Sequence, residues 1–96
     1  MTAPAQVDGK PVDYTGLPAN FREGMRRYIE QHTKPGNCTM AILSNDLMGA
    51  VLSLEASCLR DLPEIMRWIH WNSPGDCHGS REIVRAWLAK RELESA

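Results

Sequence analysis

The chain contains Arg27-Tyr28-Ile29 followed by Pro35-Gly36-Asn37-Cys38, and the same order of residue types returns as Arg67-Trp68-Ile69 followed by Pro74-Gly75-Asp76-Cys77. In each copy an amphipathic stretch ends before the Pro-Gly pair, and an Asn or Asp precedes a second apolar stretch. Pro and Gly stop helices, while Asn and Asp are favoured where helices begin. The repeat therefore predicts two helical hairpins built to one plan.

Length and charge narrow the class of protein. A chain of 96 residues is typical of one small domain. With 11 Lys and Arg against 12 Asp and Glu, it lacks the positive field that nonspecific nucleic-acid binding needs, so we expect no nucleic-acid partner. No apolar run approaches the roughly 20 residues of a membrane span, so we expect no membrane partner either. The three cysteines contain no CxxC pair and nothing resembles a signal peptide, which favours free thiols in a reducing cytoplasm.

The remaining organisation is predicted to be entirely helical. Residues 1–16 are rich in Pro and Gly without a helical period, which indicates a flexible or draped N-terminal arm in which Val12 and Tyr14 are placed to dock. No stretch alternates apolar and polar residues over the length of a strand. We therefore predict an all-α, four-helix domain over residues 17–94, made of two helical hairpins.

Capping residues set the expected helix starts. The first helix is expected from about Pro18, the third from Asp61 with Glu64 completing a capping box, and the fourth from Ser80. Pro63 then lies in the first turn of the third helix, where proline is tolerated. The residues expected to face inward from the first helix are Leu17, Phe21, Met25, Tyr28 and Ile29.

The second helix is expected over residues 40–54, with Thr39 as its cap, and it differs from the others. Apolar residues cover most of its circumference. Such a helix is usually central to its domain or covered by a partner.

Asn45 and Asp46 are the strongest candidate site residues, because they interrupt this apolar helix although Asn and Asp are normally kept at caps and turns. A buried Asp46 would need a cation, for which Arg26, Arg27 and Arg67 are available. Asn45 and Asp46 could belong to a polar network that stabilises the fold, lie on a solvent-exposed stripe of the helix, or form a ligand or partner site.

Ser80 and Arg81 form a second candidate, since a helix N-terminus with a hydroxyl and a guanidinium can receive an anion. An ordinary capping turn explains the same residues. The histidines and cysteines do not have the spacing of a zinc site, and the adjacent Cys77 and His78 seldom present the geometry of a nucleophile and its base. We expect no metal, no cofactor and no enzymatic activity.

Several of these motifs together resemble a known group. The chain resembles small proteins of tailed phages and prophages, to which no activity is assigned, in Arg27-Tyr28-Ile29-Glu30, Pro35-Gly36, the stretch Ala41-Ile42-Leu43-Ser44-Asn45-Asp46-Leu47, Pro74 with Cys77, Gly79-Ser80 and Ala86-Trp87-Leu88. The likeness spans roughly residues 17–90. It implies a phage setting in the cytoplasm of a bacterial host, and it implies no mechanism.

That setting favours an accessory protein that binds a host protein or a host defence component stoichiometrically, as a counter-defence inhibitor without turnover. The residues expected at the interface are Arg22, Arg26 and Arg27 together with Trp68 or Trp71, because Arg and aromatic residues dominate interface hot spots. One alternative is a sponge for a small, nucleotide-like ligand read by Asn45 and Asp46 with a nearby Arg. Another is a structural homo-oligomer joined through the apolar second helix.

Overall fold

The computed structural model describes residues 6–7, 10–53 and 55–95, and this part of the chain is predominantly helical, which confirms the predicted helical class. Its helices are α1 (Ala19–Gln31), α2 (Asn37–Leu43), α3 (Leu47–Leu52), α4 (Ala56–Asn72) and α5 (Arg81–Ser95). Two strands of two residues, β1 (Gln6–Val7) and β2 (Lys10–Pro11), pair in antiparallel fashion and were not expected. Residues 1–5 and 8–9 of the predicted arm, and Leu54 of the predicted second helix, lie outside the described residues.

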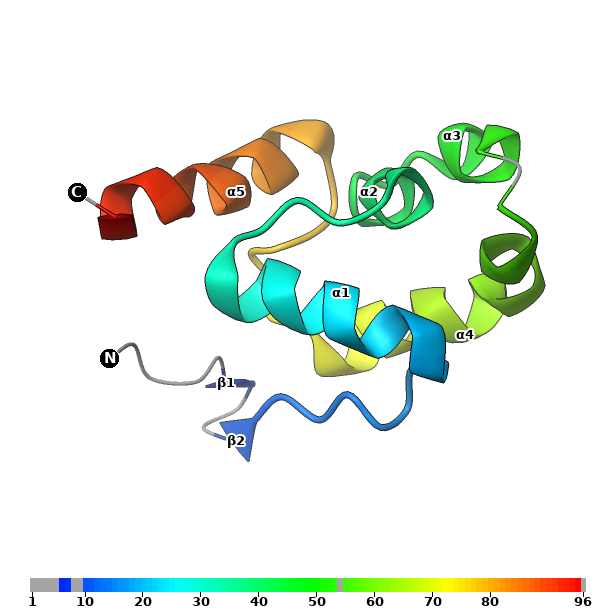
Figure 1. The fold of residues 1–96 in the computed structure, drawn as a ribbon, viewed down its shortest axis with the longest axis horizontal. Coiled ribbons are helices and arrows are strands. Elements are labelled where there is room, and N and C mark those ends of the chain that lie inside the picture. Colours follow the sequence, from blue (N-terminus) through cyan, green and yellow to red (C-terminus); the bar gives the residue numbers. More distant parts are fainter. Residues whose placement is uncertain (1–5, 8–9, 54, 96) are drawn as a thin grey trace.

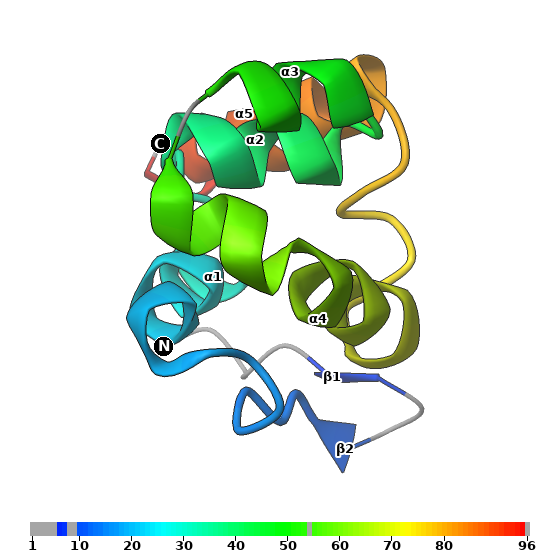
Figure 2. The same cartoon turned by 90° about the vertical axis from the view of Figure 1, so that its right-hand side faces the viewer.

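The helices form two layers. α2, α3 and α5 lie along one side of the molecule, and α1 and α4 lie side by side beneath them (Figures 1 and 2). Apolar side chains from all five helices meet in one buried cluster between the layers. Its largest fully buried members include Tyr28, Met25, Ile29, Leu43 and Ile65.

Three hydrogen bonds fix the two layers to each other. The Trp87 indole Nε1 donates to the Tyr28 carbonyl oxygen at 2.8 Å, and the Tyr28 hydroxyl donates to the Cys77 carbonyl oxygen at 2.6 Å. The Gly79 amide donates to the Leu43 carbonyl oxygen at 2.8 Å. Because buried polar groups need partners, these bonds hold the loop before α5 against both α1 and the end of α2.

The continuous helix predicted over residues 40–54 is wrong. The chain leaves the helix after Leu43, passes through Asn45 in a left-handed conformation with φ of 59°, and begins α3 at Leu47. Thr39 is not a cap, because α2 already starts at Asn37 and Thr39 is buried within it. The described residues therefore contain five helices instead of the four predicted.

The predicted start of the next helix at Asp61 is also wrong. α4 begins at Ala56 and contains Pro63 in its interior, while Asp61 pairs with Arg60 at 3.1 Å. Proline removes a backbone donor and crowds the preceding turn, which bends a helix without always ending it. Figure 2 shows α4 changing direction along its length. Among the described residues, no helix has the length and apolar character needed to cross a membrane.

The segment before α1 docks on α4, as the alternation of Val12 and Tyr14 predicted. The Tyr14 ring stacks on the Trp68 ring with a centroid distance of 5.5 Å, and Val12 also packs against the core. The Trp68 indole Nε1 donates to the Asp13 carbonyl oxygen at 2.9 Å. One tryptophan thus holds this segment by its ring face and by its polar edge.

Candidate functional site

Asn45 and Asp46 lie at a turn between two helices. The Asn45 amide donates to the Ile42 carbonyl oxygen at 3.0 Å, and the Asp46 amide donates to the Ala41 carbonyl oxygen at 2.8 Å. This pair of bonds around a left-handed residue is the Schellman motif, in which Asn is tolerated because it adopts positive φ more readily than most residues. The polar pair that is unusual inside a helix is therefore ordinary at a helix end.

The Asp46 side chain caps α3. Its Oδ1 accepts a hydrogen bond from the Gly49 amide at 2.9 Å, and its Oδ2 lies 3.9 Å from Nη2 of Arg81 on α5. The cation beside Asp46 is therefore Arg81 and not one of Arg26, Arg27 and Arg67, which were expected only for a buried Asp46. The Asp46 side chain is in fact only partly buried. Gly49 is explained by this cap, because a Cβ at this position would lie 2.9 Å from the Asp46 Cγ.

A groove opens where α2, α3 and the first turns of α5 meet. It has a volume of about 390 Å³. Its apolar lining comes from Met40, Ala41 and Val84, and its polar lining comes from Asn37, Ser44, Asp46, Arg81 and Arg85. The structure thus brings together Asp46 and Arg81, two of the residues singled out from the sequence, and adds Arg85, which was not.

Asn45 faces a different hollow. This second space, of about 210 Å³, is lined by Asn45 together with His70 of α4 and His78 of the following loop. Burial, with a smaller contribution from the neighbouring His70, lowers the pKa of His78. Asn45 and Asp46 together line only a hollow of about 20 Å³, which has room for little more than a water molecule. The larger hollows at the two residues are separate, so this geometry does not favour their cooperation on one nucleotide-like ligand.

The outward side of α3 is apolar. Leu47, Met48, Val51 and Leu52 are all exposed, with Met48 and Leu52 at 68% and 67% of their full accessible surface. We call these four residues the α3 face. The exposed Met66 of α4 continues it, since Met66 and Leu47 line the same small hollow. Soluble monomers seldom leave contiguous large apolar side chains in water, and such patches mark interaction sites.

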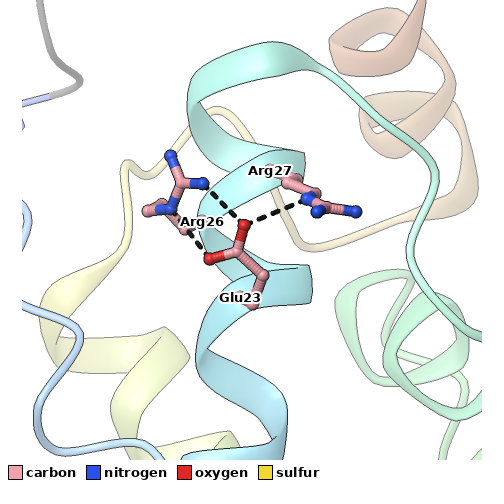
Figure 3. Close-up of polar contacts among 3 residues, drawn as sticks. All are labelled: Glu23, Arg26 and Arg27. Atoms are coloured by element: carbon pink, nitrogen blue, oxygen red, sulfur yellow. Dashed lines mark hydrogen bonds and ion pairs between the residues drawn. The ribbon is translucent and has the colours of Figure 1, made fainter.

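The three arginines of α1 do not form one free basic edge. Glu23 lies between Arg26 and Arg27, accepting from Arg26 Nη2 at 2.6 Å and from Arg27 Nε at 3.0 Å (Figure 3). The Arg26 guanidinium in particular holds the pKa of the Glu23 carboxyl below its usual range. Arg22 donates to the carbonyl oxygens of Leu17 and Thr15, so it holds the segment before α1 in place.

The two candidate indoles differ in their surroundings. Trp68 is only 3% exposed and belongs to the core, so it does not offer a docking surface. Trp71 is 74% exposed and touches the His70 ring edge-on at a centroid distance of 4.7 Å. Of the predicted indoles, Trp71 alone therefore presents its ring to solvent.

Ser80 caps α5 as predicted, because its Oγ accepts a hydrogen bond from the Ile83 amide at 3.2 Å. This bond accounts for the serine without an anion. Arg81 instead points toward the groove, where it approaches Asp46.

The expectation of free thiols is wrong for two of the three cysteines. Cys38 at the start of α2 and Cys58 near the start of α4 form a disulfide with a Cα–Cα distance of 6.5 Å. The interrupted second helix brings these two positions together, which spacing alone does not reveal. Cys77 is free and fully buried, and burial raises the pKa of its thiol to about 11. Within the described residues, no three His, Cys, Asp or Glu side chains gather in a group that could hold a metal ion.

Sequence reasoning missed Arg85 and underestimated the α3 face. The apolar circumference of the predicted second helix was the signal for that face, since it indicated a helix that is either central to its domain or covered by a partner. The only signal in the sequence for Arg85 was its position one helical turn after Arg81, which places both side chains on the same side of the helix.

Fold and site together define a small helical protein with an exposed apolar helix beside a charged groove. Comparison with protein-family models, curated proteins and solved structures finds no match to this chain.

Proposed function

We propose that this protein acts by stoichiometric binding to another protein, without catalysis, and that the α3 face is its docking surface. The observation that carries the proposal is the exposure of Leu47, Met48, Val51 and Leu52 on one short helix. Burying apolar surface at about 25 cal/mol per Å² is the main favourable term in protein association.

The construction of α3 supports this role. A helix of six residues is too short to be stable by itself, so its order comes from the contacts that hold it. Those contacts are the Asp46 cap, the fully buried Ala50 and the neighbouring α2 and α4. They use the inner side of α3 and leave its apolar outer side for a partner.

The resemblance to phage and prophage proteins supplies the setting of the proposal. The partner is then a host protein or a host defence component, and binding inhibits it. Trp71 is exposed on a separate surface of α4, outside the α3 face. Most of the edge expected from Arg22, Arg26, Arg27 and Trp68 serves contacts within the chain.

Two alternatives rest on particular observations. The groove with Asp46 and Arg81 has the size of a ligand pocket, which favours a small polar ligand. The α3 face also fits a homo-oligomer in which two copies cover each other, and light scattering after size exclusion distinguishes that state from a monomer.

The proposed function is tested by placing a charge on the α3 face. We expect Leu52→Asp to abolish capture of the specific partner from host extract, because a carboxylate cannot be buried in an apolar contact without a large penalty. Trp71→Ser is the matched control on the other exposed apolar surface and should leave capture unchanged. Unchanged capture by Leu52→Asp, in protein with the wild-type circular dichroism spectrum, contradicts the proposal. Loss by Trp71→Ser alone moves the docking surface to α4.

A further inference from the structure

One wall of the groove carries a positive charge that has no partner in the described part of the chain. Arg81 and Arg85 lie one turn apart on α5, and both line the groove. Asp46 approaches only Arg81, at 3.9 Å, and its other oxygen is engaged by the Gly49 amide. The Arg85 side chain makes no hydrogen bond or ion pair with any described residue. The groove therefore presents a net positive wall.

The rest of the lining is suited to a mixed ligand. Met40 and Ala41 supply apolar surface above the buried Val84, while Asn37 and Ser44 supply hydrogen-bonding groups. A guanidinium pairs best with a planar carboxylate, to which it can donate two parallel hydrogen bonds. A carboxylate attached to an apolar chain matches both parts of this lining.

The groove and the α3 face adjoin along α3, since Gly49 of the groove lies about one turn before Leu52 of the face. Asp46 and Gly49, which line the groove, lie in the same short stretch as Met48 and Leu52, which face solvent. The groove is open to solvent and does not enclose its contents, whereas sites for small molecules usually bury most of the ligand surface. A polypeptide segment can run from one surface to the other and be held by both.

We infer that the groove receives an acidic side chain of the partner protein, an Asp or Glu next to the large apolar residues that cover the α3 face. Arg85, assisted by Arg81, binds that carboxylate and sets the register of the partner segment. This inference rests on the proposed function, because it specifies the chemistry of the partner that docks on α3.

The test uses peptides instead of an unidentified partner. The full chain is used to select binders from a displayed library of short random peptides, and affinities are measured by calorimetry. We expect the selected peptides to be enriched in Asp or Glu beside Leu, Ile, Met or Phe. The double variant Arg81→Glu/Arg85→Glu should weaken the best peptide by at least about tenfold, as loss of charge-assisted hydrogen bonds implies. Arg67→Glu, the same change on an exposed arginine of α4, is the matched control and should have no effect.

Three results overturn the inference. The first is a selection without acidic enrichment, and the second is a double variant that binds the best peptide as the wild-type chain does. The third is binding of inorganic phosphate or adenosine monophosphate as tight as that of the best peptide and lost in the double variant, which assigns the groove to free anions. Leu52→Asp distinguishes a failure of the groove assignment from a failure of the proposed docking surface. If it abolishes peptide binding while the double variant does not, only the groove assignment fails. If it has no effect, the α3 face fails as the docking surface.

Discussion

At the scale of single residues, Asp46 contributes both to the stability of the fold and to the candidate site. One of its oxygens caps α3 through the Gly49 amide and the other faces Arg81 across the groove. A side chain that accepts a hydrogen bond at a helix start typically contributes about 1 kcal/mol to stability. The position of the carboxylate in the groove is therefore set by the helix cap and does not require a ligand.

The Asp46 cap makes a prediction for Gly49→Ala. Ala normally stabilises a helix by up to about 1 kcal/mol relative to Gly. Here the new Cβ would lie 2.9 Å from the Asp46 Cγ, so the carboxylate must rotate away and the cap is lost. We expect no gain, or a loss of up to about 1 kcal/mol, in the free energy of unfolding measured with denaturant.

The same substitution in an Asp46→Ala background gives the control. With no carboxylate to displace, Gly49→Ala should stabilise that variant by about 0.5–1 kcal/mol. The coupling between the two positions is then about 1 kcal/mol in a double-mutant cycle. Additive effects would show that the cap does not restrict Gly49.

At the scale of elements, a disulfide connects the two ends of the segment that carries α2 and α3. Cys38 and Cys58 are 20 residues apart, and both are fully buried. The Cys38 Sγ also lies 3.8 Å from the carbonyl oxygen of Ala50, the buried anchor of α3. α3, which carries the apolar face, therefore packs directly against the disulfide.

Removing this cross-link should destabilise the fold. Closing a loop of this length stabilises a protein by roughly 3 kcal/mol in the chain-entropy model. We expect Cys38→Ala/Cys58→Ala to lower the free energy of unfolding by about that amount, and addition of a dithiol reductant to the wild-type chain to have a similar effect. Amide hydrogen exchange should accelerate most in α3, because it has the fewest other anchors.

Thiol counting provides the control for the disulfide prediction. Denatured wild-type protein should show one reactive thiol, that of Cys77, before reduction and three after it. Three thiols before reduction would show that Cys38 and Cys58 are not joined. In that case the double alanine variant reports only the loss of packing.

The comparison of elements shows what local sequence can and cannot predict. α1 and α5 were foreseen because an amphipathic period and the Ser80 cap are local signals. The division of α2 from α3 was not, although Asn45 and Asp46 are residue types that favour helix ends, because their apolar neighbours satisfy a helical period on both sides. The error at Pro63 was the opposite one. A helix start was predicted just before this proline, whereas α4 continues through it with a bend. The groove depends on how α5 crosses α2 and α3, and no local pattern contains that information.

At the scale of the whole molecule, both tyrosines of the chain connect parts that are distant in sequence. Tyr28 of α1 bonds the loop before α5, and Tyr14 stacks on α4. Burial raises the pKa of both hydroxyls well above their usual value near 10, and the Glu30 carboxylate adds to the effect at Tyr14. Neither hydroxyl can ionise in place without placing a charge in the core.

These raised pKa values predict the behaviour of the fold in alkali. The unfolded chain releases its tyrosine protons near pH 10 while the folded chain retains them, so the unfolded state binds fewer protons above that pH. The free energy of unfolding should therefore be insensitive to these groups below about pH 9 and should fall as the pH rises through 10 and beyond. Tyrosinate absorbance at 295 nm should then appear only together with the loss of the helical circular dichroism signal. In denaturant both tyrosines should titrate near pH 10, and a tyrosinate signal near pH 10 from chains that remain helical would contradict their burial.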